Sequence, residues 1–163
     1  MLIVGVAFFQ VVLAVHIMAV VVGFGVTFAY PLFAVIGERL DPRAMPWYHG
    51  VQRAIGQRLI TPGLAVVLVA GIYLASDLHQ WSRFYVQWGL AVAVVLGGLG
   101  GVFFAPSERR LAELADRDVA AAAAGTEVVW SQEYLTTRRN NAVVGSLSSL
   151  LVLVTIYLMT VQN

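Results

Sequence analysis

Four long apolar stretches without a single charged residue constrain this chain more than any other feature. They cover approximately residues 5–30, 59–76, 84–105 and 142–161. A helix needs about 20 residues to cross the hydrocarbon layer of a bilayer. Hydrophobic residues make up 60% of the 163 residues, whereas soluble domains average roughly 45–50%. The pattern predicts an all-α, integral membrane four-helix bundle that forms one domain over residues 1–163.

The basic residues predict how this bundle is oriented. The chain has no lysine, and nine of its ten arginines lie in two connections, residues 31–58 and 106–141. The tenth, Arg83, lies in the short connection between the second and third stretches. Short loops rich in Arg stay in the cytoplasm. We therefore expect a multi-pass protein of the bacterial plasma (inner) membrane, with both termini outside and helical extensions in the cytoplasm.

Glycine and proline predict where the helices bend or end. The first stretch is longer than one span needs, and we expect a bend near Gly23, Gly25 and Pro31. Pro106 is expected to close the third span, and Ser107 to cap a cytoplasmic helix that stops at Gly125. Residues 107–141 then form a helical loop, in which Thr126 caps a second helix that runs into the fourth span.

Small residues recur on one face of the third stretch, which suggests a helix-packing surface. In a bilayer, small residues let helix backbones approach closely. Close packing within the chain is one explanation, and a homo-oligomer or a contact with other membrane subunits is the alternative. The residues are Gly89, Ala93, Gly97, Gly101 and Ala105.

His16 lies near the middle of the first stretch, where an ionisable side chain suggests function. Its neutral imidazole suits an axial ligand of haem iron or a proton relay. The structural alternative is a hydrogen bond to a neighbouring carbonyl or hydroxyl group, for example that of Ser148 or Ser149.

A second candidate site surrounds His49. His49, Arg53 and Gln57 are spaced at i, i+4 and i+8, and Arg58 follows. Such a helix face suits haem propionates, a quinone head group or a phosphate. In the alternative interpretation, these arginines reach to lipid phosphates at the cytoplasmic surface.

Other classes of function lack their signatures. The sequence has no cysteine, which excludes disulfides and thiolate metal sites. No catalytic or local metal-binding motif occurs, the spans hold no carboxylate, and no basic tract suggests nucleic acid.

Three segments resemble a family of predicted, uncharacterised four-helix bacterial integral membrane proteins. They are residues 23–31 (GFGVTFAYP), 58–63 (RLITPG) and 100–106 (GGVFFAP). His16 and the bundle layout are also distantly similar to copper-resistance-D-like and HemJ-like membrane bundles. That similarity implies a haem or metal role for His16.

Three functions therefore remain open. The first is a non-catalytic accessory or scaffold subunit of a membrane complex. The second is a redox component that binds haem b or a quinone through His16, helped by His49, Arg53 and Arg58. The third is a lipid-binding protein that uses the cytoplasmic arginines.

Overall fold

The computed structural model describes the backbone of residues 2–161 and the side chains from residue 8 onward, and these residues form four long helical rods. The first rod comprises α1 (Leu2–Gly25), the 3₁₀ segment η1 (Val26–Ala29) and α2 (Tyr30–Leu40). The second comprises η2 (Pro42–Ala44), α3 (Met45–Ile55), the π-helical η3 (Gly56–Ile60) and α4 (Thr61–Asp77). The third comprises α5 (Phe84–Leu99), the π-helical η4 (Gly100–Phe104) and α6 (Ala105–Ala121), and the fourth is α7 (Gln132–Val161).

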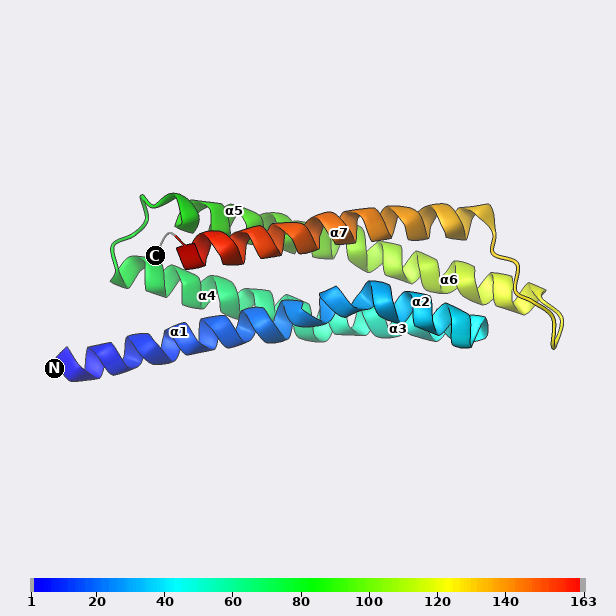
Figure 1. Ribbon diagram of the computed structural model, residues 1–163, viewed down its shortest axis with the longest axis horizontal. Coiled ribbons are helices and arrows are strands. Elements are labelled where there is room, and N and C mark those ends of the chain that lie inside the picture. Colours follow the sequence, from blue (N-terminus) through cyan, green and yellow to red (C-terminus); the bar gives the residue numbers. More distant parts are fainter. Residues whose placement is uncertain (1, 162–163) are drawn as a thin grey trace.

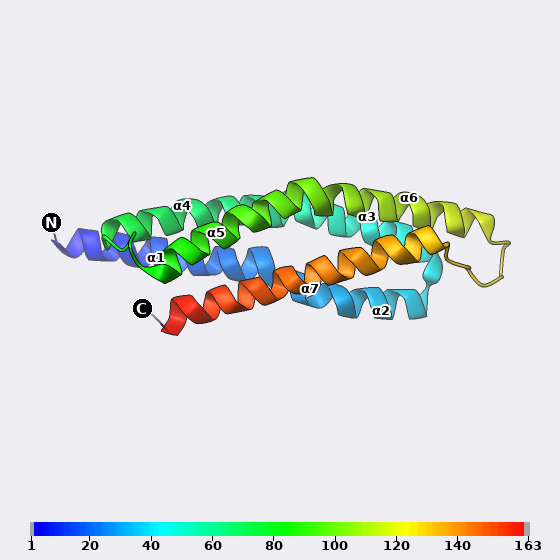
Figure 2. The ribbon, with the colours of Figure 1, turned by 90° about the horizontal axis from the view of Figure 1, so that it is seen from above.

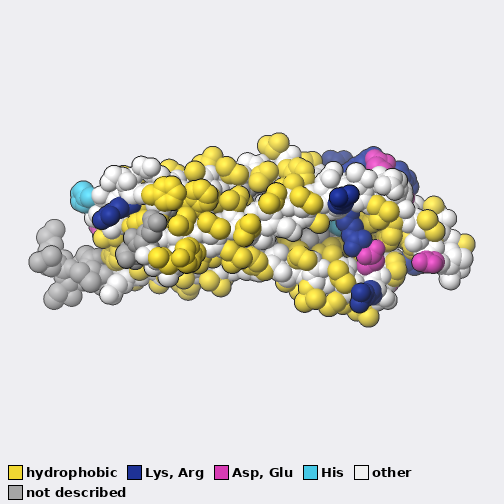
Figure 3. All heavy atoms as spheres, turned by 45° about the horizontal axis from the view of Figure 1, so that its top comes forward, with side chains coloured by type: hydrophobic (Ala, Val, Ile, Leu, Met, Phe, Trp, Pro, Cys, Tyr) yellow, Lys and Arg dark blue, Asp and Glu magenta, His cyan; other side chains and the backbone are white. Residues whose placement is uncertain are grey.

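The rods run side by side in one elongated bundle (Figures 1 and 2). Both ends of the described chain lie at the same end of the bundle as the α4–α5 connection. The α2–α3 and α6–α7 connections lie at the opposite end, where charged side chains gather (Figure 3). Each rod contains a helix long and apolar enough to cross a membrane, which agrees with the predicted number of four such helices.

A proline follows each change of helical geometry within a rod. Pro31, Pro62 and Pro106 are the second residues of α2, α4 and α6. Proline has no N–H, and its ring clashes with the carbonyl four residues earlier in a regular α-helix. The preceding 3₁₀ or π turn changes the position of that carbonyl, so the rod continues past the proline. In the first rod, where a bend was expected near Gly23, Gly25 and Pro31, the structure changes to 3₁₀ geometry at η1.

The prediction for Pro106 and Ser107 is wrong. The third rod does not end at Pro106, and Ser107 caps no new helix, because η4 connects α5 to α6 without a break. The prediction placed the helix end at a proline that the π turn accommodates. α6 instead ends at Ala121, and Gly125 lies in the following loop with a φ of 78°.

The predicted cap at Thr126 is also wrong. The Thr126 hydroxyl donates to the Ala123 carbonyl at 2.8 Å, so it is engaged in a turn. α7 begins at Gln132, and the Ser131 hydroxyl accepts from the Tyr134 N–H at 3.3 Å. Asp118 fixes this cap, because its carboxylate accepts from the Ser131 N–H at 2.8 Å.

The bundle has two cores that differ in packing. In the half with the chain ends, Phe24, Leu64, Ala93 and Val152 form a small apolar cluster. The other half, called here the polar half, comprises α2, α3, α6 and the first turns of α7. Its core contains the four largest fully buried side chains: Tyr134, Met45, Leu111 and Leu114. The polar half therefore has a core of the kind that soluble helical bundles have.

Candidate functional sites

His16 is held against α4 by a backbone hydrogen bond. Its Nδ1 lies 3.0 Å from the Val67 carbonyl oxygen, so its hydrogen-bond partner is this carbonyl and neither Ser148 nor Ser149. A carbonyl oxygen only accepts, so Nδ1 carries the proton and Nε2 of the neutral ring keeps its lone pair. Gly71 gives the ring room, since a Cβ there would lie 3.2 Å from Cε1 of His16. The imidazole is thus oriented with one nitrogen available as a ligand.

His16 has no metal-binding partners nearby among the described residues. Within residues 8–161, no group of three or more His, Asp or Glu side chains could hold a metal ion. The other two histidines lie elsewhere: His49 in α3, and His79 exposed in the α4–α5 connection. Among the described residues, His16 is therefore a single histidine ligand with no second histidine beside it.

The structure separates the residues of the second candidate site. The His49 side chain is 3% exposed, in the core of the polar half. Arg53, Gln57 and Arg58 are exposed on the surface of α3 and η3. The four side chains therefore do not form one pocket with His16, which lies between α1 and α4.

His49 belongs to a buried polar network that joins three helices. Its Nδ1 lies 3.0 Å from Oε2 of Glu108 in α6, and its Nε2 lies 3.1 Å from the Tyr134 hydroxyl in α7. The Asn141 amide of α7 donates to Oε1 of Glu108 at 2.6 Å. Glu108 is only 6% exposed, so both of its oxygens depend on these partners.

The protonation of Tyr134 follows from its burial in this network. Tyr134 lies outside the four apolar stretches, and burial raises the pKa of its phenol to about 12. The phenol is therefore protonated near neutral pH. With an ionised Glu108 and a neutral His49, Nδ1–H donates to the carboxylate and Nε2 accepts from the phenol.

Sequence reasoning missed Glu108, although α7 carries a signal of the network. Four polar residues of α7 are spaced seven apart, which places them on one face of the helix. They are Tyr134, Asn141, Ser148 and Thr155. Thr155 accepts from the Trp88 indole N–H at 3.0 Å. The Ser148 hydroxyl is buried and finds no hydrogen-bond partner in the described part of the chain.

Several arginines of the polar half hold that half together. Arg138 binds Glu38 through two hydrogen bonds of 2.9 and 2.6 Å, which ties α7 to α2. Arg43 donates to the carbonyls of Ala123 and Thr126, which ties the α2–α3 connection to the α6–α7 loop. These contacts give the arginines a structural role in addition to any role in orienting the chain.

The small residues of the third stretch have different surroundings. Gly89 is buried against Met159, and Ala93 belongs to the apolar cluster. A Cβ at Gly97 would lie 3.3 Å from Leu64, whereas one at Gly101 would meet nothing within 4 Å. Ala105 is half-buried at the start of α6. Along α5 this face therefore packs against other helices of the same chain, whereas at Gly101 of η4 it has no close neighbour.

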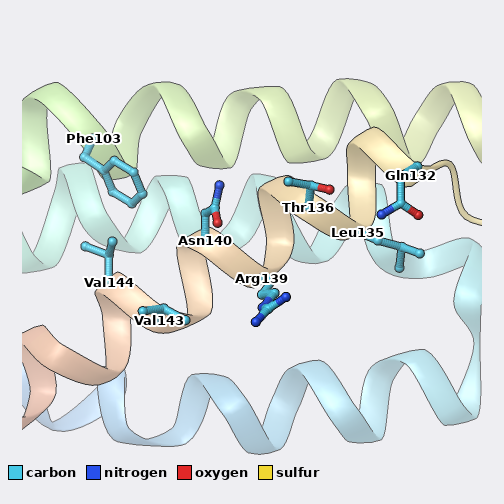
Figure 4. A pocket seen from close by; sticks show the side chains of 8 residues that line it. All are labelled: Phe103, Gln132, Leu135, Thr136, Arg139, Asn140, Val143 and Val144. Carbon is cyan, nitrogen blue, oxygen red and sulfur yellow. The ribbon is translucent and has the colours of Figure 1, made fainter.

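A groove of about 580 Å³ runs along α7 beside η4 (Figure 4). Phe103 of η4 lines it, and α7 provides the remaining residues. Those are Gln132, Leu135, Thr136, Arg139, Asn140, Val143 and Val144. Its lining is apolar at the end nearer the chain ends, and toward the α6–α7 loop it is polar apart from Leu135.

Comparisons with protein-family models, curated proteins and solved structures give no match to this chain.

Proposed function

We propose that this chain is a non-catalytic accessory subunit of a bacterial membrane complex. In this proposal the four apolar helices cross the plasma membrane, the polar half extends into the cytoplasm, and both termini are outside. The observation that carries the proposal is an apolar surface on α2, in the half of the bundle that charged residues otherwise dominate.

The α2 surface consists of large apolar side chains that pack against nothing else in the described chain over much of their area. Their exposed fractions run from 43% to 80% for Leu32, Phe33, Val35, Ile36 and Leu40. Glu38 of the same helix binds Arg138 of α7, so α2 belongs to the polar half. By contrast, α6 of the same half exposes Arg109, Arg110 and Glu113.

A partner that covered the α2 surface would contribute appreciable free energy. Fully burying a large apolar side chain is worth about 1.5–3 kcal/mol. Since these five side chains are about half exposed, covering them would add roughly 5 kcal/mol before the entropic cost of association. Contiguous exposed apolar surface of this kind marks interaction sites in soluble parts of proteins.

The polar groups inside the bundle support the same proposal. The side chains of His49, Glu108 and Tyr134 bond one another, and Arg138 bonds Glu38. Groups committed to mutual hydrogen bonds in a well-packed core fix a structure. This favours a scaffold over an enzyme.

Extraction of the native assembly tests this proposal. We expect the wild-type chain, extracted with surrounding lipid and examined by native mass spectrometry, to occur in complexes larger than its own 17.6 kDa. The double variant Leu32→Gln, Ile36→Gln should release the monomer, because glutamine keeps the helix and removes the apolar contact. Val129→Gln is the control, since Val129 is 82% exposed in the α6–α7 loop. A wild-type chain that is monomeric under all mild conditions would refute the proposal.

The second candidate function is binding of haem b or a quinone at His16. The favouring observation is the hydrogen bond from Nδ1 to Val67, which leaves Nε2 unprotonated and fixes the ring. Since this chain offers no second histidine at that depth, another axial ligand would come from a partner subunit.

An absorption spectrum of the purified complex tests this second candidate. Haem at His16 would give a Soret band that is lost in His16→Ala and kept in His79→Ala, whose side chain is exposed. For a quinone, extraction from the same preparations should show the same dependence on His16. Protein with neither a Soret band nor an extractable quinone removes this candidate and leaves the subunit proposal intact.

A further inference from the structure

We infer that the groove along α7 and η4 binds an anionic phospholipid of the cytoplasmic leaflet. Its phosphate binds Arg139, and one acyl chain follows Phe103, Val143 and Val144. This site is distinct from the α2 surface, and it differs from the lipid contacts that the sequence suggested for Arg53 and Arg58.

The lining of the groove changes from apolar to polar in the way that a phospholipid does. Val144 and Phe103 lie at one end, and Gln132 and Leu135 lie at the other, with the polar side chains of Arg139 and Asn140 between them (Figure 4). The sequence explains the apolar end of the groove, because Val143 and Val144 belong to the apolar stretch that begins at about residue 142. The groove thus crosses the boundary where apolar sequence gives way to polar sequence.

Arg139 supplies a charge that the protein leaves uncompensated. Its neighbour Arg138 is bound to Glu38, whereas Arg139 is exposed and makes no ion pair within the described residues. A guanidinium group binds a phosphate through two parallel hydrogen bonds. Asn140, Thr136 and Gln132 add amide and hydroxyl groups that can bond phosphate or glycerol oxygens.

The depth of Arg139 matches the position of a lipid phosphate. Arg139 precedes residue 142 by three residues, which corresponds to about 4.5 Å along a helix. The head-group region lies just outside the hydrocarbon layer, at this depth. A soluble phosphate would use only the polar end, whereas the apolar end beside Phe103 is accounted for by an acyl chain.

Native mass spectrometry with added phosphatidylglycerol or phosphatidylcholine tests the inference. An arginine near an anionic head group strengthens lipid binding about fivefold, so Arg139→Gln should weaken phosphatidylglycerol binding by that factor. Phosphatidylcholine shares the phosphate but carries no net charge, so the same change should weaken phosphatidylcholine binding less than it weakens phosphatidylglycerol binding. Val144→Trp, which fills the apolar end, should weaken binding of both lipids. Circular dichroism of each variant verifies that the helices remain.

Arg39→Gln is the matched control, because Arg39 is also exposed in the polar half, makes no ion pair within the described residues and lies outside the groove. Phosphatidylglycerol binding that stays near wild type in Arg39→Gln, while it falls in Arg139→Gln, supports the inference. Equal losses in the two variants would show general attraction to anionic lipid and would overturn it, as would no loss in Arg139→Gln. Displacement of the lipid by excess inorganic phosphate would identify a soluble anion site instead.

Discussion

The buried network around Glu108 gives the sharpest prediction for stability. Glu108→Ala removes the acceptor for His49 at 3.0 Å and for Asn141 at 2.6 Å, and the side chain is 8% exposed. Each buried group left without its partner costs about 1–3 kcal/mol. Two such groups give a loss of about 2–6 kcal/mol.

Glu113→Ala is the matched control for this substitution. Glu113 is on the same helix and pairs with Arg109 and Arg110, but its side chain is 49% exposed. Exposed pairs contribute about 0–1 kcal/mol, so the control should lose no more than that. Unfolding of the detergent-solubilised protein by titration with sodium dodecyl sulfate, followed by circular dichroism, measures both losses. A Glu108→Ala loss within 1 kcal/mol of the control would refute the reasoning about the network.

Two further substitutions test packing and capping in the same unfolding assay. Gly63→Val should cost about 1–3 kcal/mol, because a Cβ at Gly63 would lie 3.2 Å from the Gly23 Cα, and backbone atoms cannot move aside as a side chain does. Gly98→Val is its control, since a Cβ there meets nothing within 4 Å; equal losses would contradict the close approach of α1 and α4. Ser131→Ala should cost about 1 kcal/mol by removing the cap of α7. Thr126→Ala should cost less, and the reverse order would restore Thr126 as the cap.

The helical rods could be predicted because their cause is local. Each apolar stretch is long enough to need lipid or a core on all sides, and no charge interrupts it. The end of the third rod was mispredicted at Pro106, since a proline is compatible with either a helix end or a π turn, and the choice depends on tertiary packing. Thr126 and Ser131 were likewise equally good caps by residue type, and only the contact with Asp118 distinguishes them.

The candidate sites depend on contacts between distant parts of the chain. His49 meets Glu108 and Tyr134 at separations of 59 and 85 residues, which no local spacing encodes. Helical spacing put Arg53 on the face of His49, but the imidazole points into the core while the guanidinium is exposed. The orientation of His16 depends on one carbonyl of α4. The seven-residue spacing of Tyr134 and Asn141 is a local pattern from which a polar interior could have been predicted.

The proposed function and the lipid site both require that the chain cross the membrane with its polar half in the cytoplasm, and cysteine accessibility measures this directly. The protein has no cysteine of its own, so Ser82→Cys in the α4–α5 connection and Ala124→Cys in the α6–α7 loop each introduce one thiol. A membrane-impermeant maleimide added to spheroplasts with intact plasma membranes should label Ser82→Cys at once, and Ala124→Cys only after the membrane is permeabilised. Labelling of Ala124→Cys in intact spheroplasts, or of both positions equally, would contradict the orientation and the lipid site placed on it.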